Sequence, residues 1–274
     1  MDALKKEIVV ASGKGGTGKT FVASNLLYFL ASREFSAGGV DADVEAPDLL
    51  LALGGPRELL WRETFEGAGV ASVDYGKCIK CWRCIEACRF GALSRGPEGP
   101  LVDEAACEGL GTCTVVCPTG AISLSPRRIG DLYAARSEYG VLVVSGELAL
   151  GGKNSGLLVY ELKQRARREG VDYLVVDAAP GIGCPVISSL AGADVLIAVV
   201  EPTPQSAKGA SRLLRVAESL GVEPLLLLNK YDLNEEYAKR VQRELELEIL
   251  GSVRYLSLIH ISEPTRPRLI SYAV

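Results

Sequence analysis

The chain has 274 residues and a formal net charge of −4. That length allows one large α/β domain plus a small one, and the acidic balance argues against a nucleic-acid-binding surface as the main function. The sequence shows neither a signal peptide nor an apolar run near the roughly 18 residues of a membrane span, so we expect a cytoplasmic protein without a membrane anchor.

A glycine-rich loop follows the first predicted strand. Residues 8–11 are an apolar run, residues 21–30 have the composition of a helix, and residues 13–20 between them fit G-x-x-x-x-G-K-[ST]. In this motif the loop amides and the helix N-terminus hold phosphates, the lysine contacts the β- and γ-phosphates, and the hydroxyl binds Mg²⁺. The predicted contacts are Gly13, Lys14, Gly15, Gly16, Thr17, Gly18, Lys19 and Thr20. A plain glycine turn is the alternative.

Lys14 adds a second lysine to this loop. The sequence K-G-G-T-G-K-T resembles the deviant Walker A loop of the MinD/ParA/Mrp ATPases. The resemblance implies that the chain binds ATP as a homodimer, in which Lys14 reaches the partner's phosphates and acts in catalysis together with Lys19. The alternative for Lys14 is a solvated lysine that raises the local positive potential.

Two acidic residues follow the second predicted strand. We expect this strand over residues 36–40, although two glycines weaken its β character. Acidic residues at the C-terminal end of a strand beside a phosphate loop are placed to handle Mg²⁺ and water. By the same resemblance, Asp43 orients the attacking water and Asp41 lies nearer the metal. Turn residues without a function are the alternative.

Seven of the eight cysteines lie in residues 73–124 and form an internal repeat. Cys78-x₂-Cys81-x₂-Cys84-x₃-Cys88 is echoed 29 residues later by Cys107-x₅-Cys113-x₃-Cys117-Pro118. This spacing is typical of two-cluster bacterial ferredoxins, in which three cysteines of each run bind one cluster and the fourth binds the other. On this rule one 4Fe-4S cluster is held by Cys78, Cys81, Cys84 and Cys117, and the second by Cys107, Cys113 and Cys88.

The second cysteine run lacks one expected ligand, because position 110 is leucine, which has no lone pair for iron. We therefore predict that the second site holds a three-iron cluster, or a four-iron cluster with one iron open to solvent or to an exogenous ligand. Two alternatives apply to the cysteines as a whole. A disulfide framework is disfavoured in a chain without an export signal, and zinc prefers two C-x₂-C pairs.

The α/β pattern returns after the cysteine-rich segment. We predict strands over residues 141–144, 173–177, 194–200 and 224–228, and helices over residues 154–168 and 205–220. Asp177 ends an apolar strand and is the predicted Walker B ligand of Mg²⁺. Residues 178–185 resemble the second switch of this ATPase class, whose backbone senses the γ-phosphate.

Two residues of this half have more than one interpretation. Asn229 resembles the adenine-contacting asparagine of the class, although N-K-x-D ending at Asp232 is also typical of GTPases, and the phosphate-loop lysines favour ATP. Cys184 fits a small buried residue at a helix start. Its offset from Asp177 also resembles that of a cluster-binding cysteine in relatives of the nitrogenase iron protein.

The C-terminal segment, residues 256–274, resembles the translation of a sequencing adapter. We therefore exclude it from the fold and expect the natural sequence to depart from this one near Tyr255. The excluded segment contains His260, the one histidine of the chain.

Together these patterns predict an α/β fold, with a doubly wound, mostly parallel P-loop NTPase sheet and an inserted small α+β ferredoxin-like domain. The expected domains are residues 1–72 plus 125–255, and residues 73–124. The linked motifs resemble MinD-superfamily ATPases with an inserted ferredoxin domain.

The resemblance implies an ATPase whose nucleotide-driven dimerisation gates electron transfer through the clusters to an unidentified redox partner. One alternative is an Mrp-like, ATP-dependent carrier that hands an Fe–S cluster or metallocofactor to a recipient protein. Another is a MinD-like spatial regulator, which needs a C-terminal amphipathic helix.

Overall fold

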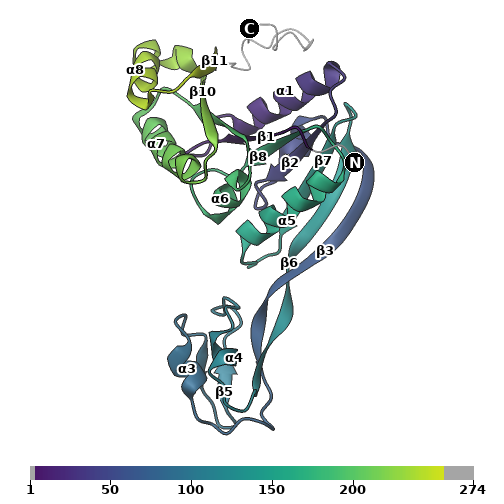
Figure 1. The fold of residues 1–274 in the computed structure, drawn as a ribbon, viewed down its shortest axis with the longest axis vertical. Coiled ribbons are helices and arrows are strands. Elements are labelled where there is room, and N and C mark those ends of the chain that lie inside the picture. Colours follow the sequence, from purple (N-terminus) through teal and green to yellow (C-terminus); the bar gives the residue numbers. More distant parts are fainter. Residues whose placement is uncertain (1–3, 256–274) are drawn as a thin grey trace. The chain divides into compact units, whose positions relative to one another are not determined.

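The computed structural model describes residues 4–255 (Figure 1). The excluded segment 256–274 and His260 lie outside the described residues. The chain divides into two compact units. The first contains the residues up to Glu63, Leu132–Glu147 and the residues from Ser155 onward, and the second contains Thr64–Asp131 and Leu148–Asn154.

Over the described part of the chain, nine strands form one sheet in the order β11-β10-β9-β1-β8-β2-β7-β6-β3. The strands are β1 (Lys6–Ala11), β2 (Ala37–Ala42), β3 (Pro56–Val73), β6 (Ile122–Ser137), β7 (Leu142–Leu148), β8 (Tyr173–Ala178), β9 (Val195–Val200), β10 (Glu223–Asn229) and β11 (Ile249–Val253). All the strands from β11 to β7 in this order pair in parallel. The predicted mostly parallel α/β sheet is therefore confirmed.

The helices of the first unit pack on both faces of the sheet. They are α1 (Lys19–Ser32), α2 (Leu49–Ala52), α5 (Ser155–Arg168), α6 (Cys184–Leu190), α7 (Pro204–Ser219) and α8 (Glu235–Leu245), with a 3-10 turn at Tyr231–Leu233. Leu227 of β10 faces the core cluster under α1, whereas its neighbours Leu226 and Leu228 face the cluster under α7 and α8. Because successive strand residues point to opposite faces, the sheet is covered on both sides, as in a doubly wound fold.

Glycine in β2 allows close packing of the strand against α1. A Cβ atom at Gly39 would lie 2.8 Å from Leu27 Cδ1 of α1, so the missing side chain lets the helix approach the strand. The low β propensity of glycine is outweighed by this contact and by pairing on both edges, with β8 and β7.

The long strands β3 and β6 were not predicted from the sequence. Glu138 N–H donates to Gly55 O near one end and Asp74 N–H donates to Ala121 O near the other, so the two strands run antiparallel. Each of them begins in one unit and ends in the other. The second unit accordingly begins before residue 73 and ends after residue 124, because it includes parts of both strands.

The rest of the second unit consists of short elements around the cysteines. They are α3 (Arg83–Ala87), β4 (Leu93–Arg95), β5 (Pro100–Val102) and α4 (Thr112–Val115), with β4 and β5 forming an antiparallel pair. Three of the cysteines, Cys84, Cys107 and Cys113, are buried in its small apolar core. A unit this small buries little apolar surface, so cross-links or metal groups commonly stabilise such units.

Candidate functional site

The glycine-rich loop connects β1 to α1, as the motif predicts. Gly18 caps α1 with φ 94°, and a Cβ atom there would lie 2.3 Å from Asn229 Nδ2. A Cβ atom at Gly13 would lie 2.0 Å from the backbone carbon of Gly209 in α7. Close backbone approach therefore requires glycine at both positions, and the N-terminus of α1 is left to face a bound anion.

Asp177 lies beside the loop at the carboxyl end of β8, paired in register with Val10 and Asp41. Burial raises its pKa to about 6, opposed by a hydrogen bond from Thr20 and by the charge of Lys19. Its Oδ1 atom is buried and, within the described residues, has no hydrogen-bond partner. A buried carboxylate oxygen without a partner, next to a threonine hydroxyl, fits a divalent cation.

Lys19 is placed between two carboxylates. Its side chain is buried, which lowers its pKa, while Asp177 and Asp43 raise it. Asp43 is half-buried; burial raises its pKa and Lys19 lowers it. The structure thus brings Lys19, Thr20, Asp43 and Asp177 together, as the sequence predicted for a phosphate and metal site.

Asp41 lies beside Asp177 and is held by backbone hydrogen bonds. It is buried, and its two oxygens accept the N–H groups of Asp43 and Leu49 at 3.2 and 2.8 Å. Burial raises its pKa to about 8. Its observed contacts hold the turn between β2 and α2, and metal coordination by Asp41 stays a prediction.

Glu201, which the sequence analysis missed, is bound to Lys14. Its carboxylate forms an ion pair with Lys14 and lies 3.3 Å from Lys230 Nζ, and Lys230 Nζ donates to Gly16 O at 2.8 Å. Burial opposes ionisation, but the hydrogen bonds from Lys14 and Lys230 keep the pKa of Glu201 below its ordinary value. Its position directly after β9, comparable to that of Asp177 at the carboxyl end of β8, was the available signal.

Asn229 braces the phosphate loop. Its Nδ2 donates to Thr17 O at 2.7 Å, and its Oδ1 accepts the N–H of Lys230 at 3.0 Å. Both ends of the Asn229 amide are therefore engaged with the protein. Contact of Asn229 with the adenine base stays a prediction. Asp232, the guanine-binding alternative, accepts the N–H of Tyr255 at 2.6 Å.

The first predicted cluster ligands gather around one small pocket in the second unit. Its lining includes all four of them, Cys78, Cys81, Cys84 and Cys117. Cys117 Sγ also accepts the N–H of Ala121 at 3.2 Å. Burial opposes ionisation of Cys117, but this bond and those from Thr119 hold its pKa below the ordinary value. Four thiols around one pocket fit an iron–sulfur cluster.

The second predicted set is also brought together. Burial raises the pKa of Cys113, and the neighbouring thiols of Cys107 and Cys88 raise it further. Leu110, at the position of the missing fourth ligand, is 72% exposed. The three thiols of this set therefore lie near one another, and position 110 supplies no fourth.

A single metal ion is the alternative to a cluster at the cysteines. No three His, Cys, Asp or Glu side chains of residues 4–255 are placed to hold one ion. Zinc, with Zn–S bonds of about 2.3 Å, needs its sulfurs roughly 3.8 Å apart, and it remains the alternative to a cluster. Mg²⁺ typically takes only one or two carboxylates plus phosphates, so the Asp177 site remains compatible with it.

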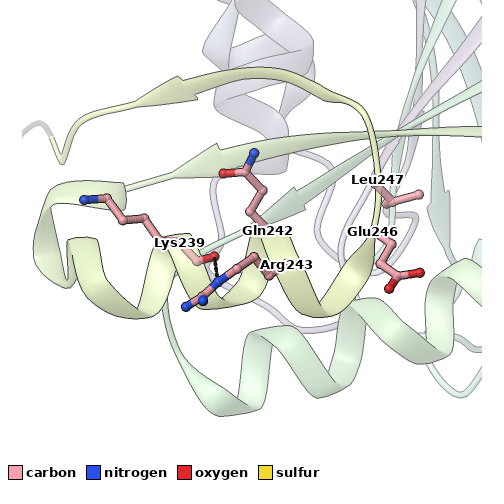
Figure 2. Close-up of a pocket in the computed structure, with 5 residues that line it drawn as sticks. All are labelled: Lys239, Gln242, Arg243, Glu246 and Leu247. Atoms are coloured by element: carbon pink, nitrogen blue, oxygen red, sulfur yellow. Dashed lines mark hydrogen bonds between the residues drawn. The ribbon is translucent and has the colours of Figure 1, made fainter.

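Three further features lie outside these groups. Cys184 begins α6 and is exposed, so the predicted buried position is wrong. A surface pocket at the end of α8 is lined by Lys239, Gln242, Arg243, Glu246 and Leu247, where Arg243 Nε donates to Lys239 O (Figure 2). This pocket contains none of the predicted site residues. Within residues 4–255, no helix has the length and apolar character to span a membrane.

Comparisons with known proteins support a nucleotide-binding domain in this chain. A model of the CobQ/CobB/MinD/ParA nucleotide binding domain matches residues 8–263. An uncharacterized protein of Methanocaldococcus jannaschii is 32% identical over 232 residues, which cover 83% of this chain and 79% of that protein. An iron-sulfur cluster carrier protein of Pyrococcus horikoshii is 42% identical over 62 residues, only 23% of this chain and 21% of the carrier.

The fold also resembles that of a solved structure, the septum site-determining protein MinD of Pyrococcus horikoshii complexed with Mg-ADP. The TM-score is 0.53 at 16% identity, and the match covers 91% of this chain and 81% of that one. At this identity the likeness concerns the fold alone.

Proposed function

The chain belongs to the CobQ/CobB/MinD/ParA family of nucleotide-binding domains, and on that premise we propose that it is an ATPase whose nucleotide-driven dimerisation gates electron transfer through iron–sulfur clusters. One observation supports the redox part most directly. The second unit of a chain with a phosphate-binding loop carries four thiols around one pocket. A partner protein would supply or accept the electrons.

The first unit supplies the groups that phosphoryl transfer needs. Phosphoryl transfer depends on positioning and on neutralising charge rather than on a covalent intermediate. The loop amides and Lys19 bind phosphate oxygens, and Asp43 orients the attacking water. The Thr20 hydroxyl and Asp177 would hold Mg²⁺, which neutralises phosphate charge when bound. In the proposed dimer, Lys14 acts on the nucleotide of the partner subunit.

The cysteines supply the ligands of the proposed clusters. Cys78, Cys81, Cys84 and Cys117 would hold a 4Fe-4S cluster, which carries one electron at a time when bound. The N–H groups directed at Cys117 Sγ favour its thiolate form.

An anaerobic preparation tests this proposal through two measurements on the same sample. We expect iron and acid-labile sulfide to be retained by the chain, together with slow basal ATP hydrolysis that a redox partner accelerates. A protein that stays colourless after anaerobic reconstitution contradicts the redox part. Failure to bind Mg·ATP contradicts the ATPase part.

A second function, an ATP-dependent carrier of Fe–S clusters, has support from the 62-residue similarity to iron-sulfur cluster carrier proteins. The two functions differ in how firmly iron is held. Retained iron with ATP-dependent reduction of an acceptor favours electron transfer, whereas iron that moves to an apo-protein favours the carrier.

The dimerisation step gives a prediction for Glu201. Lys14 cannot contact a partner's phosphates while it is paired with Glu201, so Glu201→Gln should lower the ATP concentration for half-maximal dimerisation roughly tenfold, about 1.4 kcal/mol. Lys230→Met should raise that concentration, because Glu201 is then left with Lys14 alone. Sedimentation velocity across an ATP titration measures both effects. Identical midpoints in wild type and both variants would rule out this role for Glu201.

A further inference from the structure

The two cysteine loops have positive φ at equivalent positions of the repeat, at the offset of 29. Lys80 and Gly109 have φ 54° and 70°, Trp82 and Gly111 have φ 63° and 75°, and Gly91 and Gly120 both have φ 63°. The helices α3 and α4 begin at equivalent positions, Arg83 and Thr112. A lysine and a tryptophan with positive φ are unusual, so the first loop adopts this shape against local preference. The second loop has glycine at both equivalent positions, Gly109 and Gly111.

This correspondence places Leu110 where the first loop has Cys81. Both positions are exposed, whereas the equivalent pair Cys84 and Cys113 is buried at 7% and 9% exposure. The ligand position occupied by Cys81 therefore lies on the solvent side of its loop. The same holds for Leu110, whose side chain does not fill an interior space.

Two polar side chains near Leu110 in the described part of the chain are already engaged with other groups. Glu108 Oε1 lies 2.5 Å from Lys153 Nζ and is engaged in that ion pair. The Thr114 hydroxyl donates to Gly111 O at 2.7 Å. The loop thus keeps the shape of a four-cysteine site while providing three thiolates, from Cys88, Cys107 and Cys113.

We propose that the second site binds a cluster whose fourth iron has no protein ligand and takes an exogenous thiolate from solvent. This inference rests on the proposed iron–sulfur function. The incoming thiol loses its proton to solvent and its sulfur displaces a bound water, so no electron is transferred. Without such a ligand, an added one-electron oxidant takes one electron from the cluster and the fourth iron leaves as Fe²⁺, which leaves an oxidised three-iron cluster.

The test compares wild type, Leu110→Cys and Leu110→Ala, reconstituted anaerobically in thiol-free buffer. The samples are oxidised mildly in the presence of an iron chelator. Wild type and Leu110→Ala should then lose about one iron of eight per chain and show the EPR signal of a three-iron cluster. Leu110→Cys should keep all its iron and show no such signal. Adding 2-mercaptoethanol before oxidation should protect the iron of wild type and change the EPR spectrum of its reduced second cluster.

Two results would overturn the proposal. One is equal iron loss and equal spectra in wild type and Leu110→Cys, and the other is a wild-type spectrum that does not respond to the thiol. The double variant Cys107→Ser/Cys113→Ser separates this failure from failure of the proposed function. If the double variant keeps the iron content of wild type, the second site holds no cluster and only this inference fails. If wild type binds no iron at all, both proposals fail.

Discussion

Lys19→Ala is expected to reduce ATP turnover roughly 100-fold or more while the iron content of the protein stays unchanged. The Lys19 side chain is buried at the N-terminus of α1, and its ammonium is flanked by Asp177 and Asp43. In the proposed site, removing it takes away the cation that would bind phosphate oxygens and leaves the two carboxylates beside them. Those carboxylates repel the charge that develops in phosphoryl transfer, so both binding and turnover suffer.

The Lys19→Ala experiment needs a control for the loss of one positive charge. Lys208→Ala removes an exposed lysine of α7, and we expect its ATP turnover to equal that of wild type. Turnover is measured by phosphate release and iron by colorimetric assay on the same samples. Turnover that persists in Lys19→Ala would show that another site hydrolyses ATP. Iron loss in this variant alone would show that the two units depend on each other for folding.

The parallel strands were predictable from the sequence because they are buried on both faces. A strand such as β8 is a continuous apolar run that ends in an acid, and its central residues Val175 and Val176 are fully buried. The phosphate loop was predictable for a different reason. Its glycines are required by contacts that no side chain could tolerate, such as the one between Gly13 and Gly209.

The pair β3 and β6 was not predictable, because long-range pairing rather than a local pattern stabilises it. β6 contains Pro126 and many exposed residues, and its alternation is irregular. The contact among Lys14, Glu201 and Lys230 was missed for the same reason. The three residues come from three separate loops, and their meeting depends on the order of β1, β9 and β10 in the sheet. No spacing in the sequence encodes that order.

The buried ion pair between Lys163 of α5 and Glu7 of β1 gives the largest expected effect on stability. Lys163 Nζ lies 2.7 Å from Glu7 Oε1, and the side chains are 2% and 1% exposed. The same ammonium donates to three carbonyl oxygens at the end of α6, those of Ser188, Ser189 and Ala191. It therefore neutralises a buried carboxylate as an ion pair and donates its hydrogen bonds to the last carbonyls of a helix.

Lys163→Met should lower the free energy of unfolding by about 3–5 kcal/mol, because it leaves Glu7 with only Arg167 and leaves the α6 carbonyls unpaired. At this chain length the midpoint of thermal unfolding should fall by roughly 10 °C. Arg165→Met on the same helix is the matched control. Arg165 pairs with Glu63 and Glu161 in a more exposed setting, so its loss should cost at most about 1 kcal/mol.

The double variant Glu7→Leu/Lys163→Met decides whether the ion pair or the hydrogen bonds to the α6 carbonyls account for most of the effect. Replacing both charges with apolar groups removes the unpaired carboxylate, so the double variant should be more stable than Lys163→Met alone. Urea unfolding followed by circular dichroism measures wild type and these three variants. If the double variant is as unstable as Lys163→Met, then the bonds from Lys163 to the α6 carbonyls contribute most of the stability, and Glu7 contributes little. That result would make Lys163 chiefly the cap of α6, the helix that follows the predicted second switch.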